Sequence, residues 1–127
     1  TGREILNYGH TFGHAVERIE NYTWRHGNAV SVGMMFVAHL AQLAGRLEQS
    51  VVDRHRSVLQ GVGLPVTYNR GTFNQLHDAM RIDKKSRGSK LRFIVLEHVG
   101  RPAILEAPDA ALLIAAYGKL GQADDHA

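Results

Sequence analysis

Cysteine is absent from this sequence of 127 residues. Without a thiol, neither a disulfide framework nor a thiolate zinc site can form, and any metal that the chain binds must take nitrogen and oxygen ligands. The lack of disulfide potential also makes the cytoplasm the compartment that we expect.

Long apolar runs and blocks of like charge are missing as well. The longest apolar stretches are interrupted by Ser31, His39 and Gln42, and they fall well short of the roughly 18 apolar residues of a membrane-spanning helix. No basic segment followed by an apolar run opens the chain. The 15 Lys and Arg and the 12 Asp and Glu residues, with a net charge of +3, are scattered singly. We expect no membrane and no nucleic-acid partner, whereas a mildly positive pocket would suit a bound anion.

The length and the 44% of hydrophobic residues suit one domain with a real core. We place this domain at residues 1–120 and expect a loose tail over 121–127. The chain begins with Thr1 directly before a histidine-rich segment. We therefore expect it to be part of a longer protein.

Apolar periodicity and turn residues predict a mainly α-helical domain with one small β-hairpin. The expected helices span residues 3–20, 27–47, 51–60, 110–120 and a short segment from Thr72 to about 83–85; the expected strands span 91–96 and 103–105.

Two of these helices carry specific expectations about burial. The helix over 27–47 has a wide apolar face and should form the centre of the domain. Ser50 is the expected N-cap of the helix over 51–60. The inward side of that helix is expected to consist of Val51, His55, Val58 and Leu59.

The first expected helix presents a polar stripe of unusual composition. Four of its side chains fall within about 60° of one another at 3.6 residues per turn: Arg3, Asn7, His10 and His14. Glu17 is the only acidic residue on the stripe, whereas a stripe that merely faced water would hold more Lys and Glu. Two histidines four residues apart can chelate one metal ion, although such pairs also arise by chance.

Gly9 and Gly13 lie in the same segment. Each glycine lowers helix stability by up to about 1 kcal/mol relative to alanine. Their presence makes sense if a neighbouring backbone or a ligand must approach closely.

Further candidates lie outside the stripe. His26 precedes the second helix, where its imidazole can point inward and backbone N–H groups favour anions. Lys84 and Lys85 could deliver an ammonium group to a phosphate or carboxylate, although Asp-Lys-Lys is more often a solvated turn. We expect His39 to be a core or half-buried residue. The other histidines are expected on the surface: His55, His77, His98 and His126.

Several of these segments together resemble the C-terminal half of the 3-dehydroquinate synthases, a family of sugar-phosphate cyclases. The similar segments are Leu6-Asn-Tyr-Gly-His-Thr-Phe-Gly-His-Ala-Val-Glu17, His26-Gly-Asn-Ala-Val-Ser-Val-Gly-Met34, Gly63-Leu-Pro65, Asp83-Lys-Lys85 and Arg92-Phe-Ile-Val-Leu96. They occur in the family's order, and the resemblance extends to about Tyr117. One departure is Asn28, where the family usually has Glu or Ala.

This resemblance implies a two-domain enzyme in which an N-terminal domain, absent from this chain, binds NAD. The helical C-terminal domain then completes a metal and substrate site in the cleft between the domains. The family converts 3-deoxy-D-arabino-heptulosonate 7-phosphate to 3-dehydroquinate and phosphate in the shikimate pathway, with Zn2+ or Co2+. The partners so implied are a phosphorylated sugar-acid substrate, the N-terminal domain and a second copy in a homodimer.

The resemblance also assigns roles to individual residues. It implies that His10 and His26 are the two histidine ligands of the metal, in place of a chelating His10–His14 pair, and that a glutamate of the N-terminal half is the third ligand. His14 and Asn7 are implied to contact the substrate and take part in catalysis. Arg3 is implied to bind the substrate.

The same resemblance matches one of Lys84 and Lys85 to a phosphate-binding lysine, and we favour Lys84. Two alternatives remain open. One is another sugar-phosphate cyclase, of the inosose or valiolone synthase type. The other is a helical binding module with no activity of its own, as we expect of the isolated chain.

Overall fold

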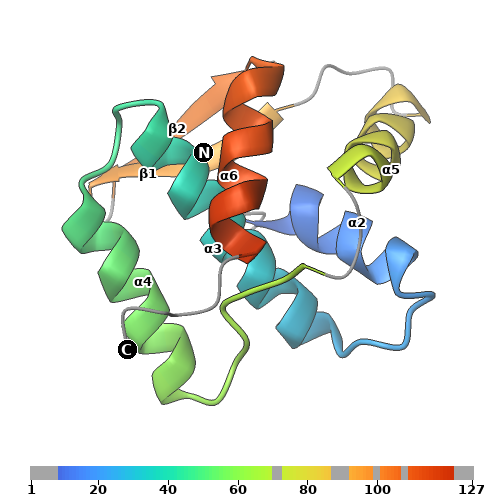
Figure 1. The fold of residues 1–127 in the computed structure, drawn as a ribbon, viewed down its shortest axis with the longest axis horizontal. Coiled ribbons are helices and arrows are strands. Elements are labelled where there is room, and N and C mark those ends of the chain that lie inside the picture. The colour runs from blue at the N-terminus through green and yellow to red at the C-terminus, as the bar shows by residue number, and fades with distance from the viewer. Residues whose placement is uncertain (1–8, 70–72, 87–91, 99–100, 107–108, 122–127) are drawn as a thin grey trace.

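The computed structural model describes residues 9–69, 73–86, 92–98, 101–106 and 109–121, with side chains described for 9–69, 73–80 and 109–121. These residues form a mainly helical fold, as predicted (Figure 1). The elements in chain order are α2 (His10–Ile19), α3 (His26–Leu43), α4 (Gln49–Gly61), α5 (Phe73–Ser86), β1 (Arg92–His98), β2 (Arg101–Glu106) and α6 (Ala110–Gly121). In the described part of the chain, no helix is long and apolar enough to cross a membrane.

Helix α3 is the centre of the fold. It contacts α2, α4, α6 and β1, and Figure 1 shows α6 crossing over it with α4 and α2 on either side. Most of its residues are buried, because its sequence is apolar on nearly every face. The prediction of a central helix in this part of the chain is therefore confirmed.

Helices α2 and α5 pack together and complete one side of the core. The ring of Phe12 on α2 stacks on that of Phe36 on α3, with a centroid distance of 4.2 Å. Leu76 and Met80 of α5 are almost fully buried. Aromatic and aliphatic contacts of this kind supply most of the stability of a helical domain.

Strands β1 and β2 pair in antiparallel register, with Ile94 opposite Ile104. The register is irregular between Leu96 and His98, close to the turn. The pair packs against α3 through β1.

Three helices end in the same hydrogen-bonded reversal of the chain, which begins at a residue with positive φ. These residues are Asn21 after α2, Gly45 after α3 and Gly63 after α4. After α3, for example, the N–H of Arg46 donates to the carbonyl of Ala41, as in a Schellman motif. The helix predicted over 27–47 is therefore too long, because Gly45 ends it earlier.

The expected helix over 3–20 is wrong at Gly9. This residue has φ +79°, a left-handed conformation in which a right-handed helix cannot continue, and α2 begins at His10. Arg3 and Asn7 lie outside the described residues. A helix that continues without a break through Gly9 is therefore excluded, whereas His10 and His14 do share a helix.

Two expectations for α4 are also wrong. Its N-cap is Glu48 and not Ser50, and no side chain caps it. Val58, expected inside, is 62% exposed, whereas Val52 is buried. Because α4 starts two residues earlier and packs on α3 along one side, the buried stripe passes through Val52 and Leu59.

Candidate functional site

The contact between α2 and α3 is one of backbone against backbone. A Cβ atom on Gly33 would overlap the carbonyl oxygen of Gly9, and one on Gly13 would lie 3.0 Å from the carbonyl oxygen of Ala29. A Cβ on Gly9 would lie 2.6 Å from the amide nitrogen of Met34. The glycines at 9 and 13 therefore serve the close approach of a neighbouring backbone, one of the two explanations that the sequence suggested.

This close approach brings three histidines together. His10 and His14 lie one turn apart on α2, and His26 is the first residue of α3. Their ring centroids are 5.6 Å apart for His10 and His14, 5.7 Å for His10 and His26, and 6.3 Å for His14 and His26. Two imidazoles that bind one tetrahedral zinc ion have ring centres about 5 Å apart, given Zn–N bonds of about 2.0–2.1 Å. The spacings of His10 with His26 and of His10 with His14 are therefore both close to that of a metal-bound pair.

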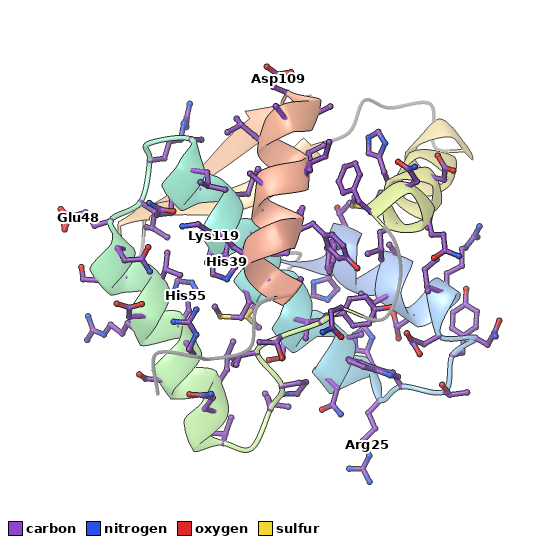
Figure 2. The ribbon with its side chains drawn as sticks, in the orientation of Figure 1. Arg25, His39, Glu48, His55, Asp109 and Lys119 are labelled. Atoms are coloured by element: carbon purple, nitrogen blue, oxygen red, sulfur yellow. The ribbon has the colours of Figure 1, made fainter. Side chains whose placement is uncertain are left out.

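The loop between α2 and α3 holds His26 in this place. The hydroxyl of Tyr68 donates a hydrogen bond of 2.7 Å to Glu20, and the ring of Trp24 packs edge-on against that of Tyr68 at 5.4 Å. Both contacts fix the loop to the core. Figure 2 shows Arg25, the residue before His26, pointing away from the body of the molecule, so α3 begins at the surface.

The histidine cluster is open to solvent. His14 and His26 are exposed and His10 is half-buried. Among the described residues, no group of three or more His, Asp or Glu side chains is arranged to hold a metal ion. A metal at His10 and His26 would need a further ligand from outside this part of the chain.

A carboxylate lies behind the cluster. Oε2 of Glu17 is 3.1 Å from Nδ1 of His26, and the side chain of Glu17 is only 16% exposed. An ionised carboxylate has no proton to donate, so Nδ1 must be the donor. The sequence pattern placed Glu17 on the polar stripe without a role. Its position seven residues after His10, on the same helix face, was the available signal.

A hollow adjoins the histidines between α2 and α5. Its volume is about 210 Å³, and its lining comprises Thr11, His14, Ala15, Glu17, Arg18, Tyr22 and Ala79. The imidazole of His14 and the guanidinium of Arg18 can donate hydrogen bonds to an oxygen-rich ligand there. The hollow is thus a place for a small polar group beside the histidines.

The other predicted substrate residues are only partly placed. Arg3 and Asn7 lie outside the described residues. Lys84 and Lys85 belong to the last turn of α5, and their side chains are outside the described part. Since α5 packs against α2, the helix that carries both lysines is a direct neighbour of the histidine helix.

His39 lies apart from the cluster, near the other end of α3. It is 4% exposed, which confirms the prediction of a core histidine. Burial lowers the pKa of His39 to about 4, and the positive charges of Arg56 and Lys119 act in the same direction. Figure 2 shows His39 beside Lys119 where α6 crosses α3, with His55 on the neighbouring α4.

The remaining histidines were expected on the surface. His55 is half-buried and its Nδ1 lies 2.8 Å from the carbonyl oxygen of Val51. His77 is also half-buried, with its ring stacked on that of Phe73 at 5.3 Å. Both are therefore more covered than a surface position predicts, and for His55 this agrees with the inward side that helical spacing gave it. The side chains of His98 and His126 are outside the described residues.

Solved structures of sugar-phosphate cyclases share this fold. A 2-deoxy-scyllo-inosose synthase, in complex with carbaglucose-6-phosphate, NAD+ and Co2+, matches 91% of the chain with a TM-score of 0.77 and 27% identity. A 2-epi-5-epi-valiolone synthase from Streptomyces hygroscopicus, with NAD+ and Zn2+ bound, matches 91% of the chain with a TM-score of 0.82 and 23% identity. At this identity, the match shows only that the fold is shared. The chain covers 34% and 32% of these two proteins. The fold is therefore that of a sugar-phosphate cyclase domain.

The sequence narrows this class to one family. Residues 1–86 match the 3-dehydroquinate synthase C-terminal family, and the chain belongs to that family. It is 64% identical over 115 residues to the 3-dehydroquinate synthase of Pseudarthrobacter chlorophenolicus and 58% identical over 120 residues to that of Streptomyces coelicolor. These alignments cover 91% and 94% of the chain but 32% and 33% of the relatives. The chain thus spans about a third of the length of its curated relatives.

Proposed function

We propose that this chain is the C-terminal metal- and substrate-binding domain of a 3-dehydroquinate synthase in the cytoplasm. The parent enzyme would convert 3-deoxy-D-arabino-heptulosonate 7-phosphate to 3-dehydroquinate and phosphate, with NAD and a divalent metal. The observation that carries the proposal is the convergence of His10 and His26 from two helices, with His14 beside them.

The donor set fits Zn2+ or Co2+. Neutral imidazoles suit both ions, and the absence of cysteine excludes thiolate ligands. His10 and His26 would hold the ion together with a glutamate of the N-terminal domain. Bound there, the ion would lower the pKa of a substrate hydroxyl and so assist hydride transfer to NAD. The exposure of the cluster agrees with a site that a second domain completes.

The residues around the histidines would bind and orient the substrate. His14 lines the hollow beside the cluster, where its ring N–H can donate to a phosphate oxygen. In the proposal, Asn7 and Arg3 bind the substrate next to it, and Lys84 or Lys85 supplies an ammonium group. Positive donors around a phosphate stabilise the charge that develops as it leaves, and the substrate's own phosphate can accept the neighbouring proton.

The proposed partners follow from the length of the relatives. An N-terminal domain would bind NAD and close over the exposed histidine cluster. The inosose synthase and the valiolone synthase were both solved with NAD+ and a divalent metal. We propose the same cofactors here, and a homodimer of the two-domain protein.

A reconstituted enzyme tests the proposal. The chain is fused to the N-terminal domain of the Pseudarthrobacter chlorophenolicus relative, which gives a fusion protein with both halves of the site. Phosphate release from the heptulosonate phosphate is then measured with NAD and zinc. We expect turnover by the fusion protein and none by the isolated 127-residue chain. A fusion protein that binds NAD and zinc but releases no phosphate contradicts the proposed reaction.

Three variants of the fusion protein separate the roles of the histidines. His10→Ala and His26→Ala should each lower zinc affinity by about 1,000-fold or more, because a ligand is lost. His14→Ala should leave the zinc content unchanged and reduce turnover. Zinc content is measured by atomic emission after dialysis. Loss of zinc from His14→Ala with retention in His26→Ala would favour the chelating His10–His14 pair instead.

A second candidate is a cyclase of the inosose or valiolone synthase type. The likeness to the inosose synthase at 27% identity favours it, whereas the sequence relatives at 64% and 58% identity are 3-dehydroquinate synthases. Assays of the fusion protein with glucose 6-phosphate and sedoheptulose 7-phosphate distinguish the candidates. We expect neither compound to replace the heptulosonate phosphate.

A further inference from the structure

The contact between Glu17 and His26 joins the two helices that carry the histidine cluster. Its length is 3.1 Å, and it ties α2 to the first residue of α3. The side chain of His26 is 59% exposed whereas that of Glu17 is 16% exposed. An exposed imidazole would otherwise rotate freely, so this partner determines its orientation.

The backbone holds Glu17 in place. The N–H of Tyr22 donates to the carbonyl of Glu17 in the reversal that ends α2. Tyr22 and Asn21 both have positive φ there, at +60° and +55°, which is uncommon for residues other than glycine. The turn that brings the chain back to His26 is thus built on Glu17 itself.

The hydrogen bond determines which ring nitrogen remains available. With Nδ1 donating to the carboxylate, a neutral His26 carries its proton on Nδ1 and has a lone pair on Nε2. Only a nitrogen with a lone pair can bind a metal ion. The carboxylate also increases the electron density of the ring and places a negative charge at the positive N-terminus of α3, where a cation alone would be disfavoured.

We propose that Glu17 is a positioning residue of the metal site: it holds His26 in the Nδ1–H tautomer, so that Nε2 is the nitrogen available to the ion. This inference rests on the proposed function, since it assumes that His26 is a ligand. Glu17 touches neither the metal nor the substrate in this role, and it acts through His26.

Zinc affinity of the fusion protein tests the proposal. Glu17→Gln keeps the size of the side chain and removes its charge, and we expect zinc affinity to fall by about 10- to 100-fold. The control is Glu48→Gln at the exposed N-cap of α4, where the side chain makes no capping hydrogen bond; it removes the same charge away from the histidines, and its affinity should stay within about twofold. Affinity is measured by competition with a chromophoric chelator, and circular dichroism checks folding.

The tautomer of His26 gives a second readout that a merely structural role would not change. In the metal-free fusion protein, nitrogen-15 spectra of labelled histidine, recorded at a pH above which the spectra no longer change, distinguish Nδ1–H from Nε2–H. We expect Nδ1–H for His26 in the wild type and a mixture of both tautomers in Glu17→Gln, because the glutamine amide can either accept from Nδ1–H or donate to an unprotonated Nδ1. A wild-type His26 in the Nε2–H form overturns the inference, even if the variant does not fold.

The outcomes separate this inference from the proposed function. A wild-type fusion protein that binds no zinc contradicts the proposed function. A wild type that binds zinc, with equal affinity in Glu17→Gln, contradicts the role of Glu17 alone. If Glu17→Gln lost its bound zinc as completely as His26→Ala, Glu17 would instead be a direct ligand of the ion. That result would also contradict the positioning role.

Discussion

The two ends of α3 each carry a histidine in opposite surroundings. His26, at the start, is exposed and has a carboxylate partner in Glu17. His39, three turns further on, is buried and has the cations Arg56 and Lys119 nearby. The carboxylate beside His26 favours a positive ion next to that ring. Burial and the positive charges near His39 keep the ring of His39 neutral. The same residue type on one helix is thus exposed beside a carboxylate at one end and part of the core at the other.

The helix packing differs between the ends as well. At the start, α2 approaches α3 with backbone against backbone at Gly9 and Gly33. Toward the other end, side chains of α4 and α6 fill the space around α3. Backbone contact fixes the histidines rigidly, but it tolerates no added atom. The predictions below test this contrast, in order of expected effect.

The largest effect is expected for Gly33→Ala. Its new Cβ would overlap the carbonyl oxygen of Gly9, and neither backbone can move aside without separating the helices. We expect the free energy of unfolding to fall by about 4 kcal/mol. Urea unfolding of the 127-residue chain, followed by circular dichroism, measures this change.

The matched control is Gly118→Ala on α6, where an added Cβ meets no atom within 4 Å. Alanine should stabilise that helix by up to about 1 kcal/mol, because it restricts the unfolded chain and favours helix. Equal effects of the two substitutions would show that α2 and α3 do not depend on this contact.

The second effect concerns the pH dependence of stability at His39. Its pKa is 6.5 in the unfolded chain and about 4 in the fold, so the unfolded state binds the extra proton between these values. Above about pH 6.5, protonation of His39 therefore does not lower the free energy of unfolding. As the pH falls from 6.5 toward 4, the free energy of unfolding decreases by up to about 3 kcal/mol.

His39→Gln removes the titrating group and is the comparison for this prediction. Its free energy of unfolding should fall less steeply over the same pH range than that of the wild type. The neighbours Asp53, Arg56, Lys119 and His55 are the same in both proteins, so their contributions largely cancel. If the free energies of unfolding of the wild type and His39→Gln, measured with urea, changed in parallel with pH, this would contradict a neutral, buried His39.

A smaller effect is expected for Ser31→Ala near the start of α3. The hydroxyl of Ser31 is buried and donates a hydrogen bond of 2.6 Å to the carbonyl of Pro65. Removing it leaves that carbonyl without this donor, which lowers the free energy of unfolding by about 1–2 kcal/mol. Ser57→Ala, at an exposed position on α4, should change it by less than about 0.5 kcal/mol. Similar losses in both variants would refute the role of this bond.

Sequence periodicity was sufficient to predict that the fold is mainly helical, that α3 lies at its centre and that His39 is buried. It failed at Gly9, because a left-handed residue set by the approach of α3 interrupts a pattern that is otherwise helical. It also missed the Glu17–His26 contact. A contact between two helices depends on their relative placement, and helical spacing within one segment carries no information about that.

The roles of the site residues came from family resemblance and not from spacing. Four-residue spacing singled out His10 and His14 as a pair, whereas the fold brings His26 equally close to His10. A histidine that lies in a loop by sequence pattern becomes part of a cluster only through tertiary structure. The ligand roles of His10 and His26 stay predictions until metal binding is measured.

The smallest effect is expected at Val58, where periodicity predicted burial and the structure shows 62% exposure. Val58→Ala removes little buried apolar surface and replaces a β-branched residue by a better helix former. The free energy of unfolding should therefore change by less than about 0.5 kcal/mol. Val52→Ala makes the same change at a fully buried position of α4 and should lower it by about 2 kcal/mol. Equal losses at the two positions in urea unfolding would mean that α4 is rotated toward α3, as the sequence pattern had predicted.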